Sequence, residues 1–331
     1  MIASVKNPNG QAAAAGFRRY GRMLADYLGL SLVLVALIIF FGLQTDHFLT
    51  LTTFRTIANQ IPDAIIIAVG MTLVLILAGI DLSVGSVLAL SSAVLGVCLL
   101  HGMPLLLAIL VCILVGLACG FLNGLLVIGW QLPSFIVTLG MMEAARGGAY
   151  LVTGSKTQYI GATIERVAEI NLFGLSLPFL IALLVVAAGQ IMLSFTAFGR
   201  RLFAAGANEE TARLSGIGVR GIKLAVFTLS GGLAAMASVI HCSRLTAADP
   251  NSGAGYELQA IAAVVIGGTS LMGGRGSIIN TFFGVVIIAV LENGLVQIGA
   301  QEPIKRLVTG CVIVIAVVVD YYRHRLGQRE K

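Results

Sequence analysis

The chain has 331 residues, of which 58% are hydrophobic and only 11% are charged, and its formal net charge is +6. Soluble domains carry about 25% charged residues, so this composition excludes an ordinary globular protein. The mean hydropathy of +0.98 points the same way. Apolar runs repeatedly reach the roughly 20 residues that cross a bilayer. We therefore expect an all-α integral membrane protein built as a polytopic helical bundle.

The apolar runs predict about ten transmembrane helices. The expected spans are 26–45, 60–79, 83–100, 103–129, 132–152, 174–195, 222–245, 257–272, 278–300 and 304–322. Two of these runs, 83–100 and 257–272, are short, so some helices are expected to be broken or half-spanning. An even number of spans puts both termini on one side of the membrane, and an eight-helix arrangement would do the same.

Residues 26–322 are predicted to form a single transmembrane domain. A cytoplasmic N-terminal tail (1–25), a cytoplasmic loop (196–222) and a cytoplasmic C-terminal tail (323–331) are expected around and within it, because lysine and arginine gather there and positive loops stay on the cytoplasmic side. These basic residues flank apolar runs, so no nucleic-acid surface is expected. The first apolar run lacks a small-residue cleavage site and is interpreted as a retained helix.

Several kinds of chemistry find no support in the sequence. It contains no HExxH pair and no GxxxxGK[ST] phosphate loop, so ATP, if it drives this protein, must be bound by another chain. The five cysteines form no CxxC pair. Neither a disulfide framework nor a metal site is therefore predicted.

Ionisable groups inside a membrane are costly and usually mark a pathway or a paired interaction. Asp81 interrupts an apolar run together with Ser83, Gly85 and Ser86. Three interpretations remain open for this carboxylate. It caps the helix that begins near Leu82, it offers hydrogen bonds to a hydroxyl-rich solute, or it relays protons.

The other ionisable groups in the runs receive more specific interpretations. Glu143 and Arg146 are three residues apart on one helix face, so they are expected to neutralise each other. Glu257 follows the glycine-rich stretch 252–256 and is expected to complement the start of a helix. Glu292 lies beside Asn293 in the ninth run and is a candidate pathway residue.

Two glycine-rich stretches resemble each other. AGIDLSVG (78–85) and GGTSLMGG (267–274) each follow an apolar run and interrupt what would otherwise be a long helix. Transporters often place substrate sites where paired, glycine-interrupted helices meet. The alternative is that two glycine-rich helix turns are alike by composition alone.

The stretch FGRRLFAAGANEETARLSGIGV (198–219) is a polar, charged segment between two apolar runs. Asn208 is a candidate N-cap for a helix over 209–215, Glu209 and Glu210 suit its first turn, and Gly216 suits its C-terminus. A short rigid helix at the membrane surface is the element through which a soluble partner could push a membrane channel.

Three stretches carry a family resemblance: GMTLVLILAGIDLSVGSVLAL (70–90), FGRRLFAAGANEETARLSGI (198–217) and GYELQAIAAVVIGGTSLMGGRGS (255–277). Together they resemble the permeases of ribose-type monosaccharide ABC importers, over about residues 45–320. The resemblance implies a permease subunit of the bacterial inner membrane, surrounded by lipid and working as a homodimer. It implies two further partners, a cytoplasmic ATPase, usually a fused double cassette that binds ATP and Mg²⁺, and a periplasmic sugar-binding protein. No cofactor is then expected in this chain.

The resemblance also implies site residues. The segment that matches the ATPase-coupling region gives Gly199, Gly206, Asn208, Glu209, Ala212, Ser215 and Gly216. The segments near the translocation path, with the intramembrane polar groups, give Gly79, Asp81, Ser83, Gly85, Ser86, Glu257, Gly267, Gly268, Thr269, Ser270, Glu292 and Asn293. Catalytic and metal-binding residues are not expected.

The expected function is therefore import of a monosaccharide, ribose or another pentose or hexose, by alternating access driven by a separate ATPase. Two other functions are the alternatives. A secondary sugar transporter would couple to protons through Asp81 or Glu292. An intramembrane enzyme that acts on lipid would need a catalytic constellation, and the sequence shows none.

Overall fold

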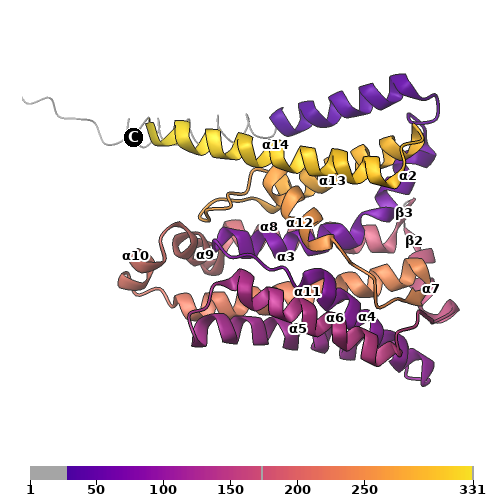
Figure 1. The fold of residues 1–331 in the computed structure, drawn as a ribbon, viewed down its shortest axis with the longest axis horizontal. Coiled ribbons are helices and arrows are strands. Elements are labelled where there is room, and N and C mark those ends of the chain that lie inside the picture. Colours follow the sequence, from indigo (N-terminus) through magenta and orange to yellow (C-terminus); the bar gives the residue numbers. More distant parts are fainter. Residues whose placement is uncertain (1–27, 173, 330–331) are drawn as a thin grey trace, which may run out of the picture.

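The structure is a computed structural model that describes residues 28–172 and 174–329. It is a helical bundle in which short helices and strands occupy the ends (Figure 1). The helices are Leu28–Gln44, α2 (Leu51–Gln60), α3 (Pro62–Ile76), α4 (Val84–Leu100), α5 (Leu105–Gly129), α6 (Ser134–Thr153), α7 (Ala162–Glu169), α8 (Leu177–Phe195), α9 (Ala197–Ala207), α10 (Glu209–Leu214), α11 (Val219–Leu245), α12 (Tyr256–Ile266), α13 (Ile278–Gln297) and α14 (Glu302–Arg329).

The strands are two residues long and pair antiparallel. β1 (Gln158–Tyr159) pairs with β4 (Ala247–Ala248), and β2 (Asn171–Leu172) pairs with β3 (Leu175–Ser176). Figure 1 shows α9 and α10 at one end of the bundle, with the C-terminal end of α14, and α7 with the short strands at the opposite end. Helix α3 lies at the centre of the bundle. All of its residues except Ala64 are buried.

Each apolar run predicted to span the membrane contains a helix, but several boundaries differ. In the part of the chain that the structure describes, four helices are long and apolar enough to cross a membrane. The number of candidate spans rises to five if the bent pair α2 and α3 is counted as one span. The helices in runs 83–100 and 257–272 are shorter, as expected. Helix α14 continues as far as Arg329, through most of the predicted C-terminal tail (323–331), whose cytoplasmic location stays a prediction. The predicted N-terminal tail lies outside the described residues. The chain is thus a polytopic helical membrane protein, and the count of ten crossings stays a prediction.

Helices α5 and α11 meet along a stripe of glycines. A Cβ atom added at Gly120 would lie 2.2 Å from the carbonyl oxygen of Phe227, and one at Gly231 would lie 2.2 Å from that of Gly116. Gly116 and Gly120 have the four-residue spacing at which small side chains let membrane helices approach backbone to backbone. We call this contact the α5–α11 seam.

The two glycine-rich stretches end their preceding helices in the same way. After α3, Gly79 N donates to Val74 O (3.0 Å) and Ala78 is left-handed with φ 57°; after α12, Thr269 N donates to Val264 O (3.1 Å) and Gly268 has φ 80°. Both patterns are Schellman caps. In the structure, Ala78 and Gly268 are therefore the equivalent residues of the two caps. The sequence alignment pairs Ala78 with Gly267, so the structural match is shifted by one residue.

Candidate functional site

Helices α9 and α10 form the polar segment that the sequence singled out. Asn208 Oδ1 accepts a hydrogen bond from Thr211 N (2.9 Å) and so caps α10. Glu209 and Glu210 occupy its first turn, and Gly216 follows it with φ 79°. The predicted helix and its N-terminal end are confirmed, whereas its C-terminal end lies at Leu214, one residue before the predicted end, with Ser215 as the C-cap.

The fixed orientation of α10 depends on contacts to its neighbours. Glu209 receives both of its short contacts from Lys223 Nζ of α11, at 2.8 and 2.7 Å. Ala212 is buried beneath the helix, whereas Leu214 is 80% exposed. Thus α10 is fastened on one side and presents an apolar side chain to the outside on the other.

Helix α9 lies directly against the end of α3, just before the first glycine-rich stretch, and against the second glycine-rich stretch. A Cβ atom at Gly206 would lie 1.7 Å from Ile76 O and 3.0 Å from Gly274 N. Gly274 N in turn donates to Ile76 O at 2.9 Å, and Gly273 faces Gly206 O and Ala78. The end of α3, the loop after α12 and the end of α9 therefore touch through their backbones. We call this contact the three-backbone junction.

Gly199, at the other end of α9, is also enclosed. A Cβ atom there would lie 2.1 Å from Leu193 O of α8, and Gly199 N donates to the capping Thr196 Oγ1 at 3.2 Å. Two coupling residues named from the resemblance, Gly199 and Gly206, thus occupy positions where only glycine fits without movement.

Asp81 is buried in a network of neutral donors. Its Oδ1 accepts from Ser83 Oγ (2.6 Å) and Ser83 N (3.0 Å), and its Oδ2 accepts from Ser230 Oγ of α11 (2.8 Å). Asn123 Nδ2 of α5 donates to Ser83 Oγ at 3.0 Å. Asp81 therefore organises the turn that leads into α4. It bonds the N–H of the N-cap residue Ser83 instead of capping the helix itself.

Glu257 and Gly85 are brought together by the loop before α12. Glu257 Oε1 accepts from Gly255 N (3.2 Å) in the first turn of the helix, which confirms its expected place. A Cβ atom at Gly85 would lie 2.6 Å from Glu257 Oε2 and 2.1 Å from Gly253 O. The loop thus reaches inward from β4 to the start of α4, where the neighbouring Ser86 is buried.

The expected pair of Glu143 and Arg146 is wrong. Arg146 Nη1 donates to Pro250 O (2.6 Å) and Ser252 O (2.8 Å), and the described residues show no salt bridge between this arginine and Glu143. Two fixed carbonyl oxygens from a neighbouring loop have replaced the carboxylate as the partner. Arg146 therefore holds the inward-reaching loop before α12.

The remaining candidate path residues lie elsewhere. Glu292 Oε1 accepts from Gln259 Nε2 (3.1 Å), and both line a cavity of about 60 Å³ between α3, α12 and α13. Asn293 Oδ1 accepts from Gln297 Nε2 at 3.2 Å. Gly267, Gly268, Thr269 and Ser270 begin the loop after α12, where Gly267 packs against the backbone of Asn280 in α13. The candidate path residues thus divide among three places: the Asp81 turn with Glu257, the Glu292 cavity and the start of the loop after α12.

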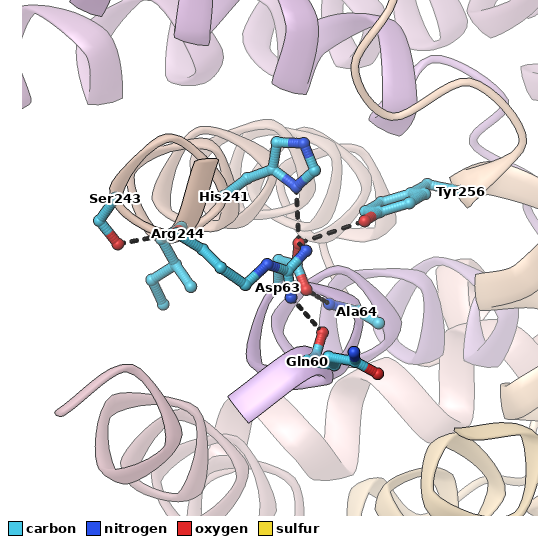
Figure 2. Close-up of polar contacts among 8 residues, drawn as sticks. Gln60, Asp63, Ala64, His241, Ser243, Arg244 and Tyr256 are labelled. Atoms are coloured by element: carbon cyan, nitrogen blue, oxygen red, sulfur yellow. Dashed lines mark hydrogen bonds and ion pairs between the residues drawn. The ribbon is translucent and has the colours of Figure 1, made fainter. Parts of the chain in front are cut away.

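The structure contains a further buried polar cluster that the sequence did not predict (Figure 2). Asp63, which is fully buried at the start of α3, accepts through Oδ2 from His241 Nδ1 (2.8 Å), Arg244 Nη2 (3.1 Å) and Tyr256 OH (3.2 Å). Arg244 also donates to Gln60 O. We call Asp63, His241, Arg244 and Tyr256 the Asp63 cluster. It ties α3, α11 and α12 together, and an aspartate within the run 60–79 was the signal for it.

Comparison with known proteins fits this architecture. Residues 53–317 match the model of the family described as "Branched-chain amino acid transport system / permease component". The chain belongs to this permease family. It is thus a multi-pass membrane permease of a bacterial ABC importer, a transport component and not a catalytic subunit.

Several curated relatives are similar over most of their length. The ribose import permease protein RbsC of Escherichia coli (strain K12) is 39% identical over 87% of this chain and 91% of its own. The D-allose transport system permease protein AlsC of the same strain is 36% identical over 89% and 91%. The fructose import permease protein FrcC of Rhizobium meliloti is 34% identical over 89% and 85%. No solved structure matches the chain.

Proposed function

We propose that this chain is the membrane subunit of an ATP-driven importer of a monosaccharide, ribose or a similar pentose or hexose. The observation that carries the proposal is the likeness to sugar import permeases along nearly the whole chain. Since these relatives are named for ribose, allose and fructose, the shared chemistry of the cargo is a small ring or chain with several hydroxyl groups.

The proposal includes partners that the chain requires. A separate ATPase, a fused double cassette that binds ATP and Mg²⁺, docks on α10. A periplasmic sugar-binding protein delivers the cargo, and two copies of this permease form the path between them. The chain crosses the membrane about ten times with both termini in the cytoplasm, so the α9–α10 end faces the ATPase. Arginine and lysine at 200, 201, 213, 220 and 223 support that orientation.

The geometry supports a route from the ATPase to the path. The exposed Leu214 offers a contact for the ATPase, while α9 touches the end of α3 and the second glycine-rich stretch through the three-backbone junction. Rigid-body movement of α9 and α10 would therefore displace the end of α3 and the loop after α12 together. In this proposal, that displacement opens one side of the path and closes the other.

Reconstituted transport tests the proposal. Proteoliposomes that hold the permease, its ATPase and internal ATP are expected to take up radiolabelled ribose, allose or fructose only when the sugar-binding protein is present outside. A proton uncoupler is expected to leave uptake unchanged, since ATP is held constant. Uptake by the permease alone that the uncoupler abolishes would instead favour proton coupling through Asp81 or Glu292.

The contact between Glu209 and Lys223 gives a sharper test of α10. Glu209→Arg places two like charges together and is expected to reduce sugar uptake severalfold while ATP hydrolysis continues. The double variant Glu209→Arg with Lys223→Glu re-forms the ion pair in reverse and is expected to restore uptake. Because an exposed pair is worth only about 0.2–1 kcal/mol, membrane insertion should stay normal in both. Full uptake by Glu209→Arg would contradict a coupling role for this end of α10.

A further inference from the structure

Figure 1 shows α7 at the end of the bundle opposite α10. A polar pocket lies beside α7. Its volume is about 220 Å³, and one water molecule takes about 30 Å³ in the liquid. Residues of four helices and a strand line it: Asn59, Glu165, Ala168, Glu169, Ser176, Pro178, Ile240, Ser243 and Arg244. The pocket is therefore large enough to admit the end of a long side chain.

The α7 pocket carries two carboxylates without cationic partners. Glu165 and Glu169 are four residues apart and share one face of α7. Neither forms a salt bridge with any residue in the described ranges, and Arg166, between them, does not line the pocket. The pocket is therefore rich in negative charge that residues 28–172 and 174–329 leave without a salt bridge.

The one arginine in the lining is already engaged. Arg244 Nη2 donates to Asp63 Oδ2 at 3.1 Å, and its Nη1 donates to Gln60 O, so the guanidinium is directed toward the buried Asp63 carboxylate (Figure 2). Asp63 already balances this charge. The two glutamates thus remain free to bind a cation from outside.

A buried hydroxyl group supplies an independent sign of a missing partner. Ser176 is only 5% exposed, it lines the pocket, and its Oγ has no hydrogen-bond partner in the part of the chain that the structure describes. A buried polar group left without a partner costs about 1–3 kcal/mol. A donor that enters the pocket would remove that cost.

We propose that the α7 pocket binds a lysine or arginine side chain of the protein that delivers the cargo to this permease. Carboxylates form charge-assisted hydrogen bonds with ammonium and guanidinium groups, and the Ser176 hydroxyl adds an acceptor. The inference rests on the proposed function, which places the α7 end at the periplasmic face. It adds the chemistry of the contact, an acidic pocket on the permease and a basic side chain on the partner.

The pocket also adjoins the interior. Arg244 is shared between the pocket lining and the Asp63 cluster, and Tyr256 of that cluster lines the cavity that contains Glu292. A cation bound at Glu165 and Glu169 therefore lies one side chain away from the buried network. Docking at the surface and the arrangement of α3, α11 and α12 are thus connected by a short series of contacts.

Binding measurements test this inference. The permease with its ATPase is placed in lipid nanodiscs, and the probe is the sugar-binding protein that supports uptake in the reconstituted system. Glu165→Gln with Glu169→Gln is expected to weaken its binding at least tenfold and to flatten the salt dependence of Kd. Arg166→Gln, on the same helix but outside the pocket, is the matched control and should bind with at most a small change. Basal ATP hydrolysis should stay the same in both variants.

The outcomes separate this inference from the proposed function. If the wild-type complex binds the probe and the double glutamine variant binds it equally well, the docking inference is overturned and the import function stands. If weakening appears only in nanodiscs that contain phosphatidylethanolamine, the pocket holds a lipid ammonium group and the inference is overturned as well. If the wild-type permease associates with neither an ATPase nor a binding protein, the proposed function fails first.

Discussion

Asp63→Ala is expected to destabilise this permease more than any other single change at a polar residue. The substitution removes the common acceptor of His241, Arg244 and Tyr256 and leaves the guanidinium of Arg244, which is 28% exposed, without its carboxylate partner. Removing one partner of a fully buried pair costs on the order of 3–5 kcal/mol, and the partial exposure of Arg244 puts the loss here toward the lower end. We therefore expect a large drop in the thermal unfolding temperature of the purified protein in detergent. Unfolding is measured by intrinsic fluorescence.

Two variants make that result specific. Asp46→Ala changes an exposed aspartate and should unfold at the wild-type temperature. Asp63→Ala combined with Arg244→Leu removes the unpaired charge as well, so its loss should be smaller than the sum of the two single losses. Strict additivity, or an Asp63→Ala protein as stable as the wild type, would show that the Asp63 cluster does not hold the three helices together.

Gly206→Ala is expected to abolish sugar uptake although the protein still inserts and binds its ATPase. The new methyl group would lie 1.7 Å from Ile76 O, so α9 must move away from α3 by more than an ångström. That movement breaks the three-backbone junction, including the hydrogen bond from Gly274 N to Ile76 O. Overpacking of this kind costs about 1–3 kcal/mol, which an otherwise intact bundle tolerates.

The measurement compares ATP hydrolysis with uptake in proteoliposomes. Gly206→Ala should hydrolyse ATP without accumulating sugar. Gly221→Ala is the matched control, because a Cβ atom at that helical position meets nothing within 4 Å. If Gly206→Ala transports like the control, movement of α9 is not transmitted to the end of α3 and the loop after α12 through this junction.

The local features of this fold could be predicted from sequence because they depend on neighbouring residues. Apolar length locates each of the helices within the predicted spans, and Asn208 with Gly216 fixes α10 within a residue or so. Glu257 was placed correctly for the same reason. The glycine-rich composition after α3 and α12 also predicted that both helices end there. It could not determine which residue of one stretch corresponds to which residue of the other.

Contacts between distant residues could not be predicted in this way. Asp63 and His241 are 178 residues apart, and no spacing rule joins them. Arg146 was assigned to Glu143 because the two share a helix face, but the carbonyl groups at 250 and 252 lie closer once the loop folds inward. Likewise, Gly206 carries no sign in the sequence that Ile76 will press against it.

The α5–α11 seam has a mechanical consequence. With no side chains between Gly116, Gly120 and Gly231, the two backbones cannot slide past each other without collision. Helix α11 has 27 residues, so at 1.5 Å per residue it is a rod about 40 Å long, stiffened along part of its length by α5. Lys223 lies near one tip and Arg244 near the other. A tilt of this single rod would therefore shift the α10 end and the α7 pocket in opposite directions at the same instant.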